Sequence, residues 1–303
     1  MWLFVALLGN MMLATVGIID KFILTKAVSK PIVFVFYTTI FVLPFFLLLP
    51  FGVKIPASQM DYLIFAVSGF CFSFGLWTMY IGFQKSEISH LGPLIGAAAP
   101  LFILFLSRIF LGEKLTTYTL LGAVILIIGS LVISFNQNTQ QHGWHRGMIW
   151  GVFAGFLFAV SHVAAKYAYD LYGFYNGFIF TKLPIGVFGA ALLFSPSVRA
   201  VFVRTEKTAV EKVASNKQLV LIVADIALGV VGSVLIQYAI ALGSVSLVNA
   251  LAGVQYAVLI VLVALISKFF PKILKETFTR NDIIQKVVAV SIISLGLFLL
   301  LVK

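Results

Sequence analysis

Long apolar runs separated by short polar segments constrain this chain more than any other feature. Five runs in the first part and five in the second are each about 20 residues long, enough to cross a hydrocarbon core of about 30 Å as a helix. They lie near residues 2–19, 31–50, 62–83, 91–111, 117–135, 147–168, 174–195, 219–242, 247–267 and 284–302. Backbone polar groups in lipid must be hydrogen-bonded within their own segment, so these runs favour helices over strands. The sequence therefore predicts an all-α polytopic membrane protein of about ten transmembrane helices.

Composition supports the same class. Of the 303 residues, 61% are hydrophobic and 10% are charged, whereas soluble domains are about 45–50% apolar and about 25% charged. The net charge of +11 comes from basic residues that flank the apolar runs, where anionic lipid headgroups are the expected partner rather than nucleic acid. The single cysteine, Cys71, lies inside the third run, so no disulfide is expected. The first run lacks a basic leader and a cleavage site, which predicts a retained helix.

A polar segment at 136–146 divides the chain into halves of five runs each, residues 1–135 and 147–303, and we interpret it as a linker. Aligning the halves gives ordered matches whose offset rises from 145 to 158 across the loop at 196–218. The matched pairs include Ala14 with Ala159, Lys21 with Lys166, Tyr80 with Tyr238 and Ser86 with Ser244. An odd number of spans in each half gives the halves opposite orientations, which predicts an inverted repeat. Inverted repeats are typical of secondary transporters.

The distribution of Lys and Arg predicts the orientation in the membrane. The odd-numbered loops hold fifteen of these residues, and the even-numbered loops with the C-terminus hold five. Because basic residues gather in cytoplasmic loops, the odd loops are expected in the cytoplasm and both termini outside. Ten of the fifteen lie around 196–218 and 268–286.

Two short motifs resemble the EamA-type repeat of the drug/metabolite transporter superfamily. They are Ala99-Pro100-Leu101-Phe102 and Leu111-Gly112-Glu113-Lys114-Leu115-Thr116, followed by Gly122 and Gly129. The second half echoes the pattern at Leu242-Gly243-Ser244-Val245-Ser246 but departs from it at Gln255-Tyr256 and Phe270-Pro271. We interpret Glu113 as part of a turn at the membrane boundary, without a catalytic role.

The resemblance has implications beyond the fold. It implies two five-helix repeats, export of amino acids or other small metabolites, and a place in the cytoplasmic membrane of a bacterium or archaeon. It also implies that both termini are cytoplasmic, which is opposite to the orientation that the loop charges predict. The sequence leaves the two orientations open.

Lys182 is the most informative single residue, because it falls about nine positions into the seventh run. A Lys in mid-membrane costs about 2.5–3.5 kcal/mol on insertion scales, so it should not face lipid. It can bind an anionic group of a substrate, or it can be a structural partner of a carbonyl or of Asp225, or snorkel to the interface. His162, in the sixth run, is expected at a depth in the membrane comparable to that of Lys182. It can share a cavity with Lys182, or it can be a packing residue without a role in substrate binding.

Further polar residues extend this candidate site. Gln237 and Ser233 lie four apart on one face of the eighth run, while Asn249 and Gln255 occupy the ninth. Each can contact substrate or can hydrogen-bond between helices. Tyr256 is a candidate cavity aromatic. The predicted substrate-binding set is therefore Lys182, His162, Gln237, Asn249, Gln255 and Tyr256.

Few carboxylates lie inside the runs, which argues against an exporter of cations. A central Lys instead favours a zwitterionic or anionic substrate. We therefore predict a secondary transporter of a small metabolite, with membrane lipid as the other partner and no cofactor or metal. A channel or a non-transporting sensor remains the alternative. An intramembrane enzyme is disfavoured, because the chain has no His-Glu-x-x-His motif and no phosphate-binding glycine loop. The coupling ion and the oligomeric state stay open.

Overall fold

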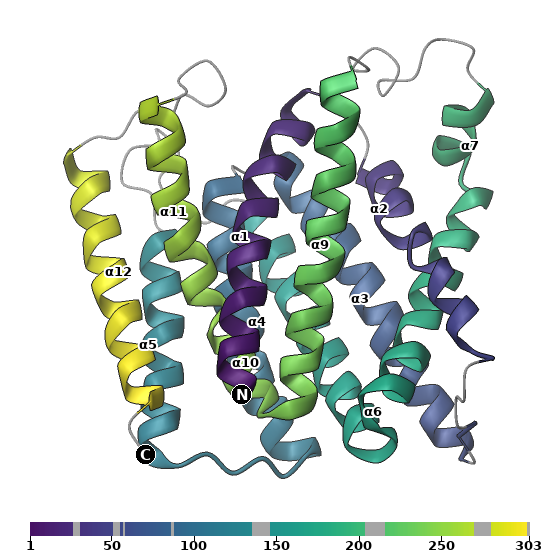
Figure 1. Cartoon of the computed structure of the whole chain (residues 1–303), viewed down its shortest axis with the longest axis horizontal. Helices are drawn as coiled ribbons and strands as arrows, with labels where there is room; N and C mark the ends of the chain where they lie inside the picture. The colour runs from purple at the N-terminus through teal and green to yellow at the C-terminus, as the bar shows by residue number, and fades with distance from the viewer. Residues whose placement is uncertain are drawn as a thin grey trace.

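The computed structural model describes residues 1–26, 31–50, 55–56, 58–85, 88–134, 146–203, 216–269 and 280–301. Every regular element in these ranges is a helix, and the long helices stand side by side in a bundle (Figure 1). The predicted all-α polytopic membrane fold is confirmed. The linker predicted at 136–146 lies outside the described residues except for Arg146, which begins a helix.

The first half contains five long helical segments. They are α1 (Trp2–Lys26), α2 (Pro31–Ile40) continued by the 3-10 helix η1 (Leu43–Leu48), α3 (Gln59–Lys85), α4 (Ile88–Phe110) and α5 (Thr117–Ser134). The second predicted span is therefore not one continuous α-helix. Its change to 3-10 geometry coincides with Pro44 at the start of η1, which cannot donate a backbone hydrogen bond.

The second half begins with a helix of 46 residues, α6 (Arg146–Ala191), which bends at Gly173 into two legs. The other described elements of this half are η2 (Leu192–Phe194), α7 (Pro196–Val203), α9 (Asn216–Leu242), α10 (Val245–Ala250), α11 (Ala252–Phe269) and α12 (Arg280–Leu301). The ninth predicted span is broken at Leu251 into α10 and α11. A short helix, α7, occupies part of the segment that the sequence suggested was a loop.

Among the described residues, five helical stretches are long and apolar enough to cross a membrane, by length and composition. They are Trp2–Ile19, Pro31–Leu48, Gln59–Lys85, Leu91–Phe110 and Gly147–Phe194, the last of which contains both legs of α6. Shorter apolar helices cover Thr117–Val132, Ala227–Leu242, Val245–Leu259 and Ile284–Leu299. The protein is an integral membrane protein, and the count of ten spans stays a prediction.

The packing of the helices repeats when the two halves are exchanged. Helix α1 of the first half packs along α9 and α11 of the second half. Likewise, helix α6 of the second half packs along α3 and α4 of the first half. Exchanging α1 for the first leg of α6, α9 for α3 and α11 for α4 converts one set of contacts into the other. In Figure 1, α1 and the first leg of α6 run in opposite directions. The division into repeats stays a prediction, and this packing is the arrangement expected of an inverted repeat.

The pair α5 and α12 forms a second contact between the halves, which we call the α5–α12 seam. A Cβ atom at Gly296 of α12 would lie 2.9 Å from the carbonyl oxygen of Gly122 in α5. One at Gly129 would lie 2.5 Å from a side-chain carbon of Ile293. Glycine therefore lets the two backbones meet, as is common between membrane helices.

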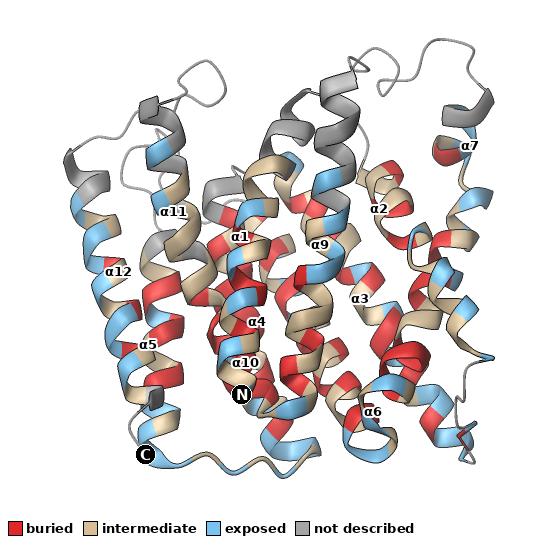
Figure 2. Cartoon of the chain, viewed as in Figure 1, coloured by how far each residue is buried: buried red, intermediate tan, exposed pale blue. Residues whose placement is uncertain are grey.

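Large apolar side chains cover the outside of the bundle. Phe4, Phe105, Phe110 and Phe298 are all more than 60% exposed, and Figure 2 shows exposed residues along the outer sides of the helices. Helix α1 begins and helix α12 ends at the same end of the bundle (Figure 1). We call this end the terminal face. The turn between α4 and α5, the helix α10 and the bend of α6 also lie at this face.

Candidate functional site

The bend of α6 brings Lys182 and His162 to similar depth in the bundle. Gly173 has φ 72° and ψ 170°, a conformation that glycine adopts far more readily than other residues. His162 lies eleven positions before Gly173, and Lys182 lies nine positions after it. At about 1.5 Å rise per residue the two side chains leave their helix legs at nearly the same level. The prediction that both lie at comparable depth therefore follows from the position of one glycine.

The ammonium group of Lys182 lies between two aromatic rings. Its Nζ is 5.0 Å from the centroid of Phe72 on α3 and 5.4 Å from that of Phe178, one turn earlier on the same leg. Cation–π contacts of this kind contribute about 0.5–2 kcal/mol, most when the cation is removed from water. Within the part of the chain that the structure describes, Lys182 forms no ion pair with a carboxylate. The side chain of Asp225, the structural partner considered from sequence, lies outside the described residues.

His162 lies between Lys182 and Asn249 in the candidate site. The buried imidazole lies near both the Lys182 ammonium and the Asn249 side chain. Its Nδ1 is buried and has no hydrogen-bond partner among the described residues. Buried polar nitrogens are normally satisfied, so this atom can accept or donate a hydrogen bond that the protein itself does not supply.

Asn249 lies on α10, where its Nδ2 donates to the carbonyl oxygen of Val245 at 2.9 Å. This bond leaves the Oδ1 end of the amide as the group that faces other partners. The short helix α10 is held at its start by Ser244, whose hydroxyl accepts from the backbone N–H of Leu247 at 3.0 Å. The N-cap therefore fixes the helix that carries Asn249.

Gln237 is buried on α9 and bonds to a residue that the sequence did not indicate. The hydroxyl of Tyr169, on the first leg of α6, donates to Gln237 Oε1 at 2.7 Å. The Tyr169 hydroxyl also lies near Thr181, the neighbour of Lys182 in the chain. Tyr169 lies seven residues after His162, and a spacing of seven places both on one face of the same helix leg. Gln237 is thus joined to the leg that carries His162.

The other predicted residues are less closely connected. Gln255 is half-buried in the first turn of α11, and the side chain of Tyr256 lies outside the described residues. Ser233 donates to the carbonyl oxygen of Val230 in its own helix at 2.9 Å. The structure therefore brings Lys182, His162 and Asn249 together and joins Gln237 to them through Tyr169. Phe178 could have been found from sequence, because it lies four residues before Lys182, whereas Phe72 and Tyr169 carry no comparable signal.

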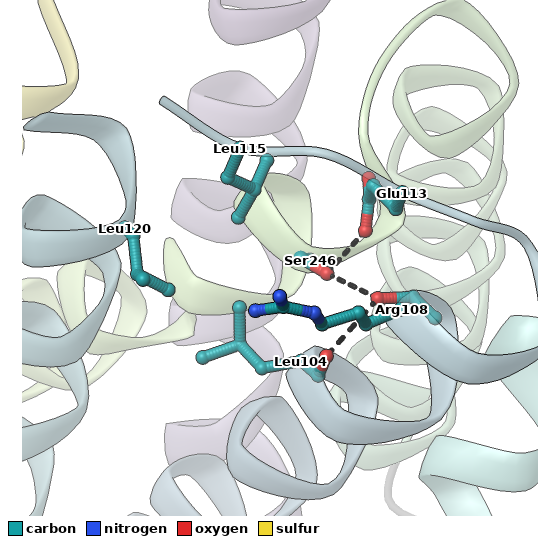
Figure 3. Close-up of a pocket in the computed structure, with 7 residues that line it drawn as sticks. Leu104, Arg108, Glu113, Leu115, Leu120 and Ser246 are labelled. Carbon is teal, nitrogen blue, oxygen red and sulfur yellow. Dashed lines mark hydrogen bonds between the residues drawn. The ribbon is translucent and has the colours of Figure 1, made fainter. Parts of the chain in front are cut away.

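A second polar group lies at the terminal face, where α4 ends. Gly112 has φ 63°, and the carbonyl oxygen of Ser107 accepts from the backbone N–H of both Leu111 and Glu113. Glu113 is therefore part of a tight turn, which is the position interpreted for it from sequence. A pocket of about 80 Å³ opens here (Figure 3). Its walls are Leu104, Ser107, Arg108, Glu113, Leu115, Leu120 and Ser246.

Comparisons with known proteins agree with this architecture. Residues 1–135 match the sequence model of the EamA-like transporter family. Twenty-eight chains of solved structures match this chain. One of them, described only as the crystal structure of a protein, is 16% identical over 97% of this chain and 95% of its own, with a TM-score of 0.64. This likeness shows the fold alone. No protein with a curated description matches the chain.

Proposed function

We propose that the chain is a membrane transporter of the EamA-like family, within the drug/metabolite transporter superfamily, and that it is a secondary transporter of a small zwitterionic or anionic metabolite. The match of residues 1–135 to the sequence model of that family supports the proposal. An amino acid is the type of substrate proposed. The direction proposed is export across the cytoplasmic membrane of a bacterium or archaeon, and the chain is assigned no enzymatic activity.

Lys182 is the observation that carries the proposal. Its ammonium lies at mid-length in a leg of α6, against the faces of two phenyl rings and without a described carboxylate partner. A charge of this kind is costly in a membrane unless it has a partner or a function. A substrate carboxylate supplies the missing negative charge, and the attraction is stronger in a poorly hydrated site than in water.

The neighbouring groups suit the rest of such a substrate. The Nδ1 of His162, which has no described hydrogen-bond partner, and the Oδ1 end of Asn249 come from the first leg of α6 and from α10, whereas the ammonium of Lys182 lies against Phe72 and Phe178. An oxygen acceptor next to an imidazole can hydrogen-bond to an ammonium group, whereas Lys182 attracts the carboxylate. This distribution of charge favours a zwitterion over a simple anion.

Alternating access is the mechanism proposed. The site is built from α6, α9 and α10 of the second half and from α3 of the first half, so relative motion of the halves changes its exposure. The exchange pattern of the packing supports this, because halves related as inverted repeats can adopt each other's conformation.

Counterflow tests the proposal. The purified protein is placed in proteoliposomes that are loaded with unlabelled metabolites, one amino acid or organic acid in each preparation, and uptake of the same labelled solute is followed. A carrier accelerates uptake when unlabelled solute is present on the other side, whereas a channel does not. Accelerated exchange of at least one zwitterionic solute is expected, and its absence for the whole panel would remove the proposed function.

A further inference from the structure

Two groups of hydrogen bonds join the halves of the protein at the terminal face. In the first, Ser246 of α10 is hydrogen-bonded to Ser107 of α4, with 2.8 Å between the hydroxyl oxygens, and also donates to the carboxylate of Glu113. In the second, the hydroxyls of Tyr172 and Tyr167 on α6 donate to the carboxylate of Asp61 on α3, Tyr167 at 3.4 Å. We call these the serine contact and the tyrosine contact.

The serine contact is shielded from solvent and is held in place by the backbone. Ser107 and Ser246 are 1% and 0% exposed, and Figure 3 shows Ser246 between Glu113 and the end of α4. The tight turn at Gly112 directs Glu113 back toward α10. A carboxylate acceptor makes such a bond stronger than one between neutral groups. The contact therefore fastens the α4–α5 turn of the first half to α10 of the second.

The tyrosine contact uses a buried carboxylate in the same way. Asp61 is 6% exposed and lies in the first turn of α3, where the helix dipole favours a negative charge. Tyr172 immediately precedes the bend at Gly173, so its position depends on that bend. A further bond nearby, from the Tyr175 hydroxyl to the carbonyl oxygen of Leu48 at 3.1 Å, also connects the two halves.

These contacts differ in kind from the α5–α12 seam. At the seam, backbone packs against backbone with no space for water, and separating the helices would leave cavities. When helices joined by hydrogen bonds part and water enters, water replaces the lost partners, so only the net free energy of each bond is lost. The serine and tyrosine contacts can thus open and close more readily than the α5–α12 seam.

We propose that the serine and tyrosine contacts form a gate at the terminal face, that this gate is closed in the present structure, and that it must open during each transport cycle. The proposal rests on the alternating access proposed above. It places the access route to Lys182 from the terminal face between α3, α4 and α10 on one side and the bend of α6 on the other.

Cross-linking tests the gate directly. In a Cys71→Ala background, which has no other cysteine, Ser107→Cys and Ser246→Cys place two thiols where the hydroxyl oxygens are 2.8 Å apart, close enough for a disulfide. Oxidation is expected to form the disulfide and to reduce counterflow at least tenfold, and dithiothreitol is expected to restore it. The matched control is Thr116→Cys with Thr119→Cys, whose hydroxyls are 2.9 Å apart within the first half; its disulfide should leave counterflow unchanged.

The outcomes separate the gate from the function. If the cross-linked Ser107 and Ser246 pair exchanges solute at the full rate, the gate is refuted and the carrier remains. If the unmodified protein shows no counterflow with any solute, the carrier itself is refuted.

A second measurement serves if the cysteine pair fails to fold. Thr181→Cys in the Cys71→Ala background reports access to the position next to Lys182, with the sidedness of the terminal face set by a protease-sensitive C-terminal tag. An impermeant maleimide applied at that face should label it slowly. Adding Glu113→Gln and Tyr172→Phe, which weaken the two contacts, should raise the labelling rate at least fivefold. An unchanged rate would overturn the gate.

Discussion

The hydroxyl of Tyr169 donates a 2.7 Å hydrogen bond to Oε1 of Gln237, and the two side chains are 4% and 5% exposed. This bond determines which end of the Gln237 amide is available to another group. Because Oε1 is occupied by the tyrosine, the NH₂ end is the one that can donate to a substrate or to a neighbouring helix.

Removing this hydroxyl should destabilise the protein. Tyr169→Phe keeps the ring and leaves the buried Oε1 of Gln237 without its donor, which typically costs about 1–3 kcal/mol. We expect a lower midpoint of thermal unfolding in detergent and, in the proposed carrier, weaker substrate binding. Tyr238→Phe is the control, since the ring of Tyr238 packs edge-on against Phe174 at 5.0 Å and keeps that contact. Equal melting of the two variants would show that the Tyr169 bond is energetically unimportant.

Loss of the charge at Lys182 should abolish transport while keeping the fold. Lys182→Met retains length and apolar bulk and removes an ammonium that has no described carboxylate partner. Because a charge within the membrane is costly, the unfolding midpoint should not fall. Substrate affinity should drop at least tenfold, which corresponds to about 1.4 kcal/mol. Lys182→Arg keeps the charge and the contact with Phe72 and Phe178, and should retain part of the activity. Full transport by Lys182→Met would rule out an anion-binding role.

The α5–α12 seam should tolerate no side chain at Gly296. A Cβ there would lie 2.9 Å from the Gly122 carbonyl oxygen and from the Leu126 backbone nitrogen, and overpacking of this kind costs about 1–3 kcal/mol. Gly296→Ala should therefore lower the unfolding midpoint. Gly229→Ala is the matched control, because the nearest atom to its Cβ is 3.8 Å away in Val16, and alanine is the better helix former. A control that melts earlier than Gly296→Ala would contradict the close packing described for the seam.

The bend of α6 should depend on glycine at position 173. No atom lies within 4 Å of the Cβ that Gly173→Ala would add, so the expected cost is conformational only, about 1–3 kcal/mol. The tyrosine contact should loosen as well, because Tyr172 adjoins the bend. Hydrogen exchange in the first turn of α3 would reveal this loosening. Unchanged protection there, together with an unchanged melting midpoint, would show that alanine accommodates the bend.

The orientation in the membrane can be decided by labelling. Loop charges predict that the segments around 196–218 and 268–286 are cytoplasmic. Single cysteines placed there in the Cys71→Ala background should resist an impermeant thiol reagent added to intact cells and react after permeabilisation. Modification in intact cells would place the termini in the cytoplasm instead, as the family resemblance implies.

Sequence patterns predicted the class of fold well because membrane-spanning helices are visible in a sequence as long apolar runs. Each helix must satisfy its own backbone hydrogen bonds in lipid, so long apolar runs specify helices without knowledge of tertiary packing. Interruptions within helices were harder to predict. The ninth predicted span breaks at Leu251 without a glycine or proline at that position, and the joining of the two legs of α6 depends on the conformation of one glycine, Gly173.

The candidate site was predictable only in part. Lys182 was conspicuous because a charge inside an apolar run is costly, and His162 followed from helix geometry. The contacts of Gln237 with Tyr169 and of Lys182 with Phe72 join residues 68 and 110 positions apart in the chain. In a sequence with 30 Phe and 10 Tyr residues, composition does not distinguish these aromatics from those that face lipid. Asp61 was missed because it borders the third run, and its burial depends on tyrosines of another helix.

The exposed phenylalanines on the outer sides of the bundle have a practical consequence. Side chains such as Phe4 and Phe298 are solvated by acyl chains in a membrane and by detergent tails after extraction, so the amphiphile belongs to the thermodynamic system that is being measured. A melting midpoint for this protein is a property of protein and amphiphile together. Variants are comparable only in the same detergent or lipid at the same ratio, and a change of tail length alone can shift every value in a series.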